Sequence, residues 1–244
     1  MKKTTLCLFV ALLCWPASRL PAQPAPDAAT PEAKAAAARA KSDADQQKKA
    51  AEWVAALKLN DAAKDARVQA VIAAHLRAVR DWHNEHPYTT VPAGINPVTG
   101  KLLSNLDRQM IANSAIPKSV HQALMDGLRA DLVPGEVETI LDKYTVGKVA
   151  FTLAGYHAIV PDLSPEEEAT ILGHLRQARE EAVDYKNMNQ ISAVFEIYKT
   201  KSEQFLIGNG RDWKKLYKAY GDAAKAKKLA AAAEKAPGTP PANP

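Results

Sequence analysis

Two groups of polar side chains have a spacing that could form a ligand-binding site. The first follows Leu163, where Arg176, Arg179, Glu180 and Asp184 fall within three helical turns. A guanidinium group beside carboxylates suits paired hydrogen bonds to sugar hydroxyls or to an anionic group. Arg176 and Glu180 are also spaced to pair along one helix, and Arg179 can reach a neighbouring helix. The alternative interpretation is therefore a solvated or interhelical salt-bridge face.

The second group lies across a predicted helix end and the start of the next helix. It contains Tyr144, Lys148, Thr152 and Tyr156. Thr152 and Tyr156 are spaced to share one face of a helix, beside an apolar stripe. This face could form the floor of a polar pocket with aromatic walls, as in many ligand sites. The alternative is a pair of buried tyrosines whose hydroxyls bind backbone groups.

The remaining polar patterns indicate neither a metal site nor a known catalytic site. His83 and His86 lie near a predicted helix end, but the sequence contains no HExxH motif and places no third ligand beside them. There is also no GxSxG motif, no Gly-rich phosphate loop and no Ser-Lys arrangement. Paired carboxylates for glycoside hydrolysis cannot be picked out, because the fold sets their separation. We therefore predict no metal and no cofactor, and the sequence identifies no catalytic residue.

The elements that must position these side chains are predicted to be helices. Val68, Ile72 and Val79 belong to a continuous apolar stripe at helical spacing. Ser164 precedes a proline and three acids, and Glu167 completes a capping box, which predicts a helix start. No alternation of strands and helices is present, so the predicted fold class is all-α, a single bundle-like domain of several helices.

Further helices and one long loop complete the expected domain. Gly147 is predicted to stop a helix in the left-handed conformation. The loop Tyr88–Lys101 contains two prolines and two glycines, with a short hairpin expected around residues 96–100. The other helices are expected over residues 45–57, 61–86, 106–112, 117–132, 134–144, 149–160 and 191–207.

The two ends of the chain have a different composition. Residues 1–22 combine a basic start, a short apolar run and small residues before Ala22, the layout of a secretory signal peptide. Residues 23–44 are rich in Ala and Pro and are expected to be a flexible spacer before a helical domain at 45–220. Residues 221–244 are expected to be a disordered tail. Both cysteines lie in the predicted signal peptide, so the exported chain would have neither a disulfide nor a catalytic thiol.

Net charge is distributed unevenly along the sequence. The formal charge of the whole chain is +5. Removal of residues 1–22 would leave +2, of which residues 211–244 carry +5 and residues 23–210 carry −3. A nucleic-acid-binding protein is expected to carry its basic face on the folded domain. The sequence therefore excludes nucleic acid as the expected partner. It also contains no apolar run of about 20 residues that would span a membrane.

Several spaced motifs resemble an uncharacterised family of secreted bacterial proteins. They are YTVGKV and VPDLSPEEEATIL within residues 144–184, F..YK at 195–199 and GNGRDW at 208–213. The likeness covers about residues 50–213. The family occurs mainly in Bacteroidetes, Verrucomicrobia and Planctomycetes, often beside genes for polysaccharide breakdown, and it is suggested to bind sugars. The resemblance implies a location and a context, and it carries over no catalytic residue. LSPEEEATIL is also similar to the LTxxQ helix starts of small periplasmic stress chaperones.

Three hypotheses follow. The first is a secreted or periplasmic helical protein, without enzymatic activity, that binds an oligosaccharide or polysaccharide. The second is a hydrolase or lyase of polysaccharides, which requires Tyr144, Lys148, Tyr156 and Arg179 to meet in one cleft. The third is a chaperone-like or scaffold protein with an exposed apolar concave face. The candidate ligand-binding residues, which we expect to face one another, are Tyr144, Lys148, Thr152, Tyr156, Arg176, Arg179, Glu180 and Lys199.

Overall fold

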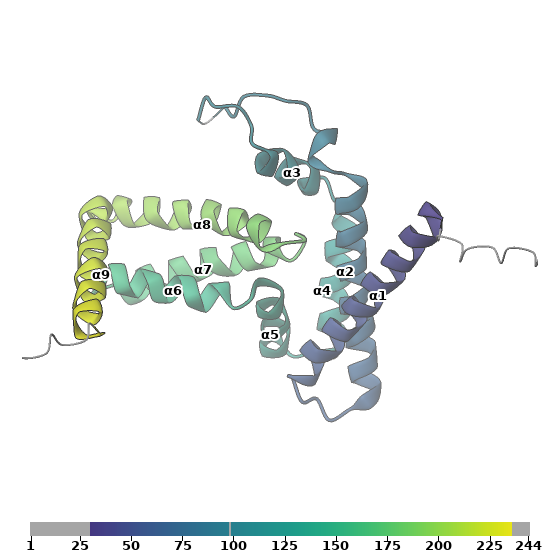
Figure 1. The fold of residues 1–244 in the computed structure, drawn as a ribbon. Coiled ribbons are helices and arrows are strands. Elements are labelled where there is room, and N and C mark those ends of the chain that lie inside the picture. The colour runs from purple at the N-terminus through teal and green to yellow at the C-terminus, as the bar shows by residue number, and fades with distance from the viewer. Residues whose placement is uncertain (1–29, 98, 236–244) are drawn as a thin grey trace, which may run out of the picture. The chain divides into compact units, whose positions relative to one another are not determined.

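The computed structural model describes residues 30–97 and 99–235, and within them all regular structure is helical apart from one isolated antiparallel bridge between Ile95 and Leu102. This confirms the all-α fold class. Figure 1 shows the helices in chain order. They are α1 (Pro31–Ala55), α2 (Ala62–Glu85), the 3-10 helix η1 (Tyr88–Thr90), α3 (Asn105–Ser114), α4 (Lys118–Asp131), α5 (Pro134–Thr145), α6 (Lys148–Ile159), α7 (Pro165–Ala182), α8 (Met188–Gly208) and α9 (Trp213–Lys235).

The structure corrects both predicted ends of the helical domain. The expected spacer is helical over residues 31–44, because α1 begins at Pro31. The expected disordered tail is helical from residue 221 as far as Lys235. Alanine is the strongest helix former, so an Ala-rich segment can be helical without burying large apolar side chains. The predicted signal peptide, residues 23–29 of the expected spacer and residues 236–244 lie outside the described residues.

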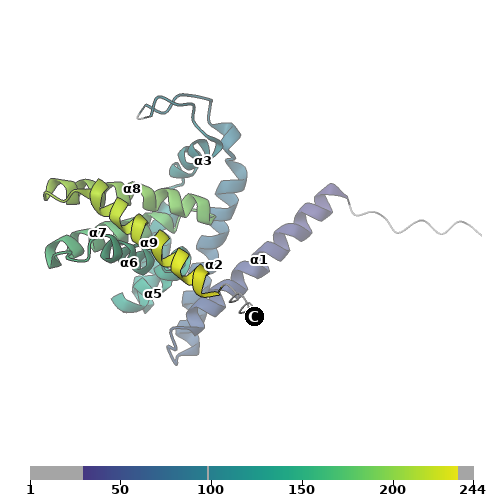
Figure 2. The same cartoon turned by 60° about the vertical axis from the view of Figure 1, so that its left-hand side comes forward.

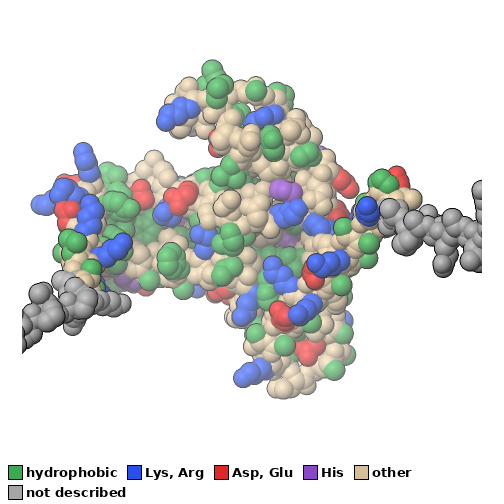
Figure 3. Space-filling view, in the orientation of Figure 1, with side chains coloured by type: hydrophobic (Ala, Val, Ile, Leu, Met, Phe, Trp, Pro, Cys, Tyr) green, Lys and Arg blue, Asp and Glu red, His purple; other side chains and the backbone are tan. Residues whose placement is uncertain are grey.

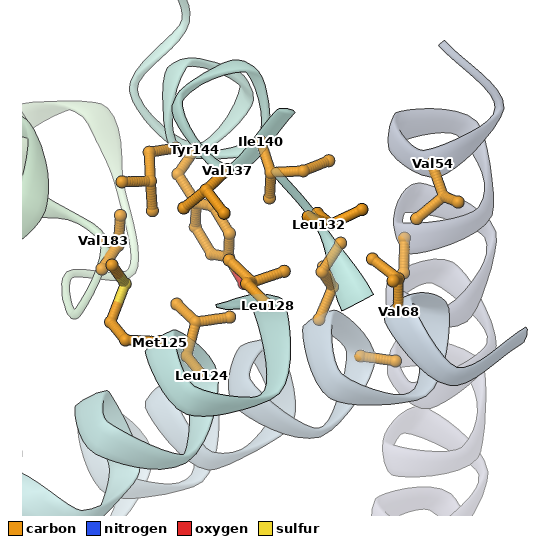
Figure 4. Close-up of a cluster of buried hydrophobic side chains, with 14 residues drawn as sticks. Val54, Val68, Leu124, Met125, Leu128, Leu132, Val137, Ile140, Tyr144 and Val183 are labelled. Carbon is orange, nitrogen blue, oxygen red and sulfur yellow. The ribbon is translucent and has the colours of Figure 1, made fainter. Parts of the chain in front are cut away.

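The chain divides after Ala40 into two units, and the described part of the first is the N-terminal portion of α1. The second unit, from Lys41 onward, contains two clusters of buried apolar side chains. One cluster joins α1, α2, α4 and α5, with Leu128 and Ile140 fully buried (Figure 4). The other joins α6, α7 and α8; it includes the buried Phe195, and Trp213 of α9 packs against it.

Local sequence explains where the helices that carry the candidate residues begin and end. The Ser164 hydroxyl accepts a hydrogen bond from the Glu167 amide at 3.2 Å, and Ser164 N–H donates to the Glu167 carboxylate at 3.0 Å. The predicted capping box of α7 is thus confirmed. At the end of α5, Val146 already has a left-handed backbone with φ of 53°, and Gly147 follows with φ of 66°. The predicted stop at Gly147 is therefore preceded by a β-branched residue in a conformation that such residues rarely adopt.

The hairpin expected in the long loop is also present. Asn96 N–H donates to Lys101 O at 2.8 Å, and Leu103 N–H donates to Gly94 O at 2.9 Å. The Arg108 side chain holds the start of this loop by donating to Val91 O at 2.9 Å from Nε. None of the described helices is long and apolar enough to cross a bilayer.

Helices α2 and α4 approach so closely that a glycine is required between them. A Cβ atom placed on Gly127 would lie 2.7 Å from both Cγ atoms of Val71. Gly127→Ala is therefore expected to lower the free energy of unfolding, because overpacking costs about 1–3 kcal/mol whereas alanine gains roughly 1 kcal/mol over glycine in a helix. Urea unfolding would measure the change.

Two further variants separate the steric cost from the helix propensity. Gly173→Ala on α7 meets no atom within 4 Å, so it should stabilise the protein. Adding Val71→Ala to Gly127→Ala should recover part of the loss by removing the clash. The close approach would be contradicted if the double variant lost as much free energy of unfolding as the Gly127→Ala and Val71→Ala single variants lose together.

Candidate functional site

A surface groove between α6, α8 and α9 collects half of the candidate residues. It has a volume of about 750 Å³, and its lining includes Lys148, Thr152, Tyr156 and Lys199. The predicted shared face of Thr152 and Tyr156 on α6 is thus present. The Tyr156 hydroxyl donates to Lys199 O of α8 at 3.1 Å, as the buried-tyrosine interpretation predicts for this residue. We call this surface the aromatic groove.

Exposed aromatic rings give the aromatic groove its character. Phe151 of α6 is 79% exposed and Tyr217 of α9 is 57% exposed. The Trp213 ring lies between two other rings of the groove, with its centroid 5.7 Å from that of Tyr156 and 6.1 Å from that of Tyr217. Tyr220 lies one turn further along α9 and also lines the groove. Figure 3 shows hydrophobic side chains gathered beside α9, where it crosses α6 and α8.

Charged side chains stand among these rings. Lys199 Nζ donates to both carboxylate oxygens of Glu196, at 2.9 and 3.0 Å. Burial and the nearby negative charge of Glu196 raise the pKa of Glu203, although the charge of Lys199 opposes this rise. Lys148 Nζ lies 5.4 Å from the centre of the Phe195 ring. The groove thus offers positively and negatively charged hydrogen-bonding groups next to aromatic faces.

A cluster of ion pairs positions α9 over the groove. Arg211 donates from Nη2 to Glu167 at 2.7 Å and from Nη1 to Asp162 at 2.7 Å. Glu167 is the acid of the α7 capping box, so the GNGRDW segment is tied to the LSPEEE segment. Trp213 starts α9 directly after this contact. Figure 2 shows α9 running across the ends of the neighbouring helices.

The two arginines of the first candidate group lie elsewhere, between α5 and α7. Arg179 is buried and donates to Asp142 at 2.8 Å, and it also lies 3.5 Å from Glu138. Arg176 lies 3.6 Å from Glu138 and forms no ion pair with Glu180. These contacts agree with the interhelical salt-bridge interpretation of this group.

Tyr144 and Glu180 belong to a polar network that sequence analysis missed, which is buried at His75 and Tyr144 and exposed at Glu180. Asp184 of the α7–α8 connection accepts hydrogen bonds from Nε2 of His75 and Nδ1 of His121, both at 2.9 Å. The Tyr144 hydroxyl lies 3.1 Å from Nδ1 of His75. Glu180 lies 3.7 Å from Nε2 of His121. The network therefore joins α2, α4, α5 and α7.

The hydrogen bonds to the Asp184 carboxylate determine the tautomers of the His75 and His121 rings. An ionised Asp184 can only accept, so Nε2 of His75 and Nδ1 of His121 are the donors. Nδ1 of His75 then faces the Tyr144 hydroxyl, whose pKa is raised well above its ordinary value by burial. Nε2 of His121 does not bind Asp184. The His121 ring lines an open groove of about 590 Å³, together with Tyr198 and Glu180.

The network shifts the pKa values of His121 and Asp184. The hydrogen bond and charge of Asp184 raise the pKa of His121. Burial alone would raise the pKa of Asp184, but the hydrogen bonds from His121 and His75 outweigh it and hold this pKa below its ordinary range. An imidazole held in this way can accept and return a proton at Nε2. Across the same groove, burial and the hydrogen bond to Glu181 raise the pKa of Tyr198 to about 12.

The expectation that all eight candidates face one another is wrong. Lys148, Thr152, Tyr156 and Lys199 meet in the aromatic groove, Arg176 and Arg179 pair with α5, and Tyr144 and Glu180 join the histidine network. The convergence of Tyr144, Lys148, Tyr156 and Arg179 required for the predicted enzyme is therefore also wrong. The left-handed turn at Val146–Gly147 redirects the chain, so Tyr144 packs on α2 while Lys148 starts a helix that faces α9.

Three of the other histidines, His83, His86 and His174, also contact specific side chains. The His86 ring stacks on Trp82 with centroids 3.7 Å apart. His83 Nδ1 lies 3.3 Å from the side-chain amide of Gln190, and Nδ1 of His174 lies 3.0 Å from the Ser202 hydroxyl. No group of three His, Cys, Asp or Glu side chains within the described part of the chain is arranged to hold a metal ion.

One signal in the sequence could have located the aromatic groove more fully. Trp213, Tyr217 and Tyr220 recur at helical spacing and so share a face of α9. The last predicted helix ended at residue 207, so this pattern was overlooked. No comparable signal exists for the histidine network, because His75 sits at a helical position among apolar residues and its partners lie on distant helices.

The fold and the groove define an all-helical protein whose surface carries a cleft with aromatic walls. The chain belongs to the family described as "Protein of unknown function (DUF3826)", which it matches over residues 43–226. This confirms the expected membership of an uncharacterised family, and the matched range contains the aromatic groove and the histidine network. A comparison with curated proteins finds no match.

Proposed function

We propose that this protein is exported and binds a saccharide in the aromatic groove. The observation that carries the proposal is the set of exposed rings on two facing helices, Phe151 on α6 and Tyr217 and Tyr220 on α9, beside the Glu196–Lys199 ion pair. The composition of residues 1–22 supports export. The family resemblance supports a role in the use of polysaccharides.

The proposed ligand fits the chemistry of the groove. A sugar ring has apolar C–H faces and a rim of hydroxyls, so it needs flat apolar surfaces with donors and acceptors at their edges. Aromatic rings supply the surfaces, and such pockets commonly hold a few polar groups that orient the ligand. Glu196, Lys199 and Thr152 provide carboxylate, ammonium and hydroxyl groups within the same groove. A purely apolar concave face, as the chaperone hypothesis requires, would lack these groups.

Tyr217→Ala is expected to weaken saccharide binding about tenfold, because the lost ring contact is worth about 1 kcal/mol or somewhat more. Tyr217 is 57% exposed, so its removal should leave the fold intact. Isothermal titration calorimetry with neutral and acidic plant and algal oligosaccharides, chosen from a glycan array, would measure the effect.

Leu229→Ala is the matched control, because Leu229 lies on α9, is 71% exposed and is not among the groove residues. It should bind as tightly as the unaltered protein. Absence of binding to every saccharide on the array would refute the proposal, and equal weakening by both substitutions would place the binding site elsewhere.

A further inference from the structure

A second groove lies on another part of the unit that begins at Lys41. The C-terminal part of α1, the end of α5 and the α7–α8 connection form its walls, and its volume is about 710 Å³. Its rings are Trp53, Tyr144 and Tyr185. Nothing in the proposed saccharide site uses these residues. We call this surface the lysine groove.

Three lysines from three different elements line the lysine groove. They are Lys49 of α1, Lys143 of α5 and Lys186 of the α7–α8 connection. None of them forms an ion pair with a carboxylate among the described residues. The single carboxylate in the lining is Asp142, which is held by Arg179 at 2.8 Å. The groove therefore gathers lysine charge that pairs with no carboxylate in the described part of the chain.

The environment of Lys186 shows this excess most clearly. Its ammonium group donates to the neutral side chain of Asn84 at 2.7 Å. Burial and the positive charge of Arg80 lower the pKa of Lys186. The charge of Lys186 in turn adds to burial in lowering the pKa of His83. Arg80 is paired with Asp43 and Asp81, whereas Lys186 is bound to a neutral amide. A partly buried ammonium group without a carboxylate partner is unfavourable unless something else supplies negative charge.

The aromatic wall holds a second cation at the groove. Lys49 Nζ lies 5.0 Å from the centre of the Trp53 ring. The Trp53 ring in turn packs edge-on against Tyr144, with centroids 4.7 Å apart. The stem of Lys49 is thereby placed against a fixed surface, so less conformational entropy would be lost on binding. Figure 3 shows Lys and Arg side chains gathered over α5 and the adjoining part of α1.

We propose that the lysine groove binds an oxyanion, a carboxylate, sulfate or phosphate group, between Lys49, Lys143 and Lys186. Ammonium groups from three sides can approach such a group together, and the bond of each to a charged acceptor is stronger than a neutral hydrogen bond. Trp53 and Tyr185 offer an apolar wall to whatever carries the anion. The groove shares no lining residue with the aromatic groove, so the two sites can be tested separately.

Titration calorimetry on the full chain tests the proposal with four probes: inorganic phosphate, glucuronate, glucose 6-sulfate and neutral glucose. The three anions should bind, and their affinity should fall as ionic strength rises because salt screens the attraction. Lys49→Gln, Lys143→Gln and Lys186→Gln should each weaken anion binding about tenfold, the effect of losing one hydrogen bond to a charged group. Stronger binding of glucuronate than of phosphate would identify the anion as part of a sugar, and equal binding would identify a free oxyanion.

Lys48→Gln is the matched control. Lys48 precedes Lys49 on α1 but pairs with Glu52 at 3.9 Å and does not line the groove. Its substitution removes the same charge and should leave anion binding unchanged within twofold. The proposal is overturned if no anion binds, if glucose binds as well as glucuronate, or if Lys48→Gln weakens binding as much as Lys49→Gln. A Tyr217→Ala variant should keep anion binding here, so failure of the saccharide proposal would not affect the result.

Discussion

Asp184→Ala should lower the free energy of unfolding by about 3–5 kcal/mol, the usual cost of breaking a buried pair of charged or hydrogen-bonded groups by removing one partner. His75 is only 3% exposed, so its Nε2–H would lose its acceptor with no water to replace it. His121 would lose its acceptor as well. Because these two rings lie on α2 and α4, the change should loosen the packing of both helices against the α7–α8 connection.

The loss should depend on pH. The pKa of His121 is raised from an ordinary value of 6.5, so its protonated form favours the folded state. That contribution is fully present below pH 6.5 and is lost as the pH rises through the folded pKa. Urea unfolding at pH 5.5 and pH 9 should therefore show a larger difference between the unaltered protein and Asp184→Ala at the lower pH.

A neighbouring substitution serves as the control for Asp184. The Glu180 side chain is 49% exposed and lies 3.7 Å from His121, so Glu180→Gln should change stability by less than about 0.5 kcal/mol. If Asp184→Ala were no more destabilising than Glu180→Gln, the network would contribute nothing to stability.

Glu167→Gln should cost roughly 2 kcal/mol at neutral pH, because several hydrogen bonds to a charged acceptor are weakened at once. Glu167 accepts from Arg211 and from the Ser164 amide, and these bonds lower its pKa from an ordinary value of 4.5 to about 2. A carboxylate with a lowered pKa stabilises the fold when the pH is above the ordinary pKa of the group. This contribution is lost as the pH falls towards 2. The stability difference between the unaltered protein and Glu167→Gln should therefore shrink steadily from pH 5 to pH 2.

The same variant should also weaken saccharide binding, since Arg211 would no longer hold the start of α9 beside the groove. Glu168→Gln is the control, because Glu168 is half-exposed and its carboxylate lies 3.5 Å from His157, away from Arg211. It should leave both stability and binding almost unchanged. A pH-independent difference between Glu167→Gln and the unaltered protein would show that the charge of Glu167 is not what stabilises the contact.

Local signals predicted most of the helices but not their full extent. The apolar stripe of α2 and the capping box of α7 are short-range patterns, and both helices begin within a residue or two of the expected positions. The alanine-rich ends were misjudged, because flexibility was inferred from the lack of large apolar side chains. Helix formation in such segments depends on backbone propensity instead, and alanine has the highest.

The candidate residues illustrate which parts of a site can be predicted. Thr152 and Tyr156 share a face because their spacing dictates it, and Lys199 joins them because α8 packs beside α6 and α7. The network around Asp184 could not be predicted, since His75 is 109 residues away and His121 is 63 residues away in the chain. Contacts at that separation depend on how helices pack, and no local pattern encodes the choice of partner.

The Glu167–Arg211 contact also has a consequence for the order of folding. It joins residues 44 positions apart, and it can form only after α8 has packed back along α7. Closing such a loop costs entropy before the contact returns any stability. The helix pair α7–α8 should therefore form first and the aromatic groove last. In hydrogen exchange, the amides of α9 should then be the first in this unit to lose protection, in a local opening that leaves both cores intact.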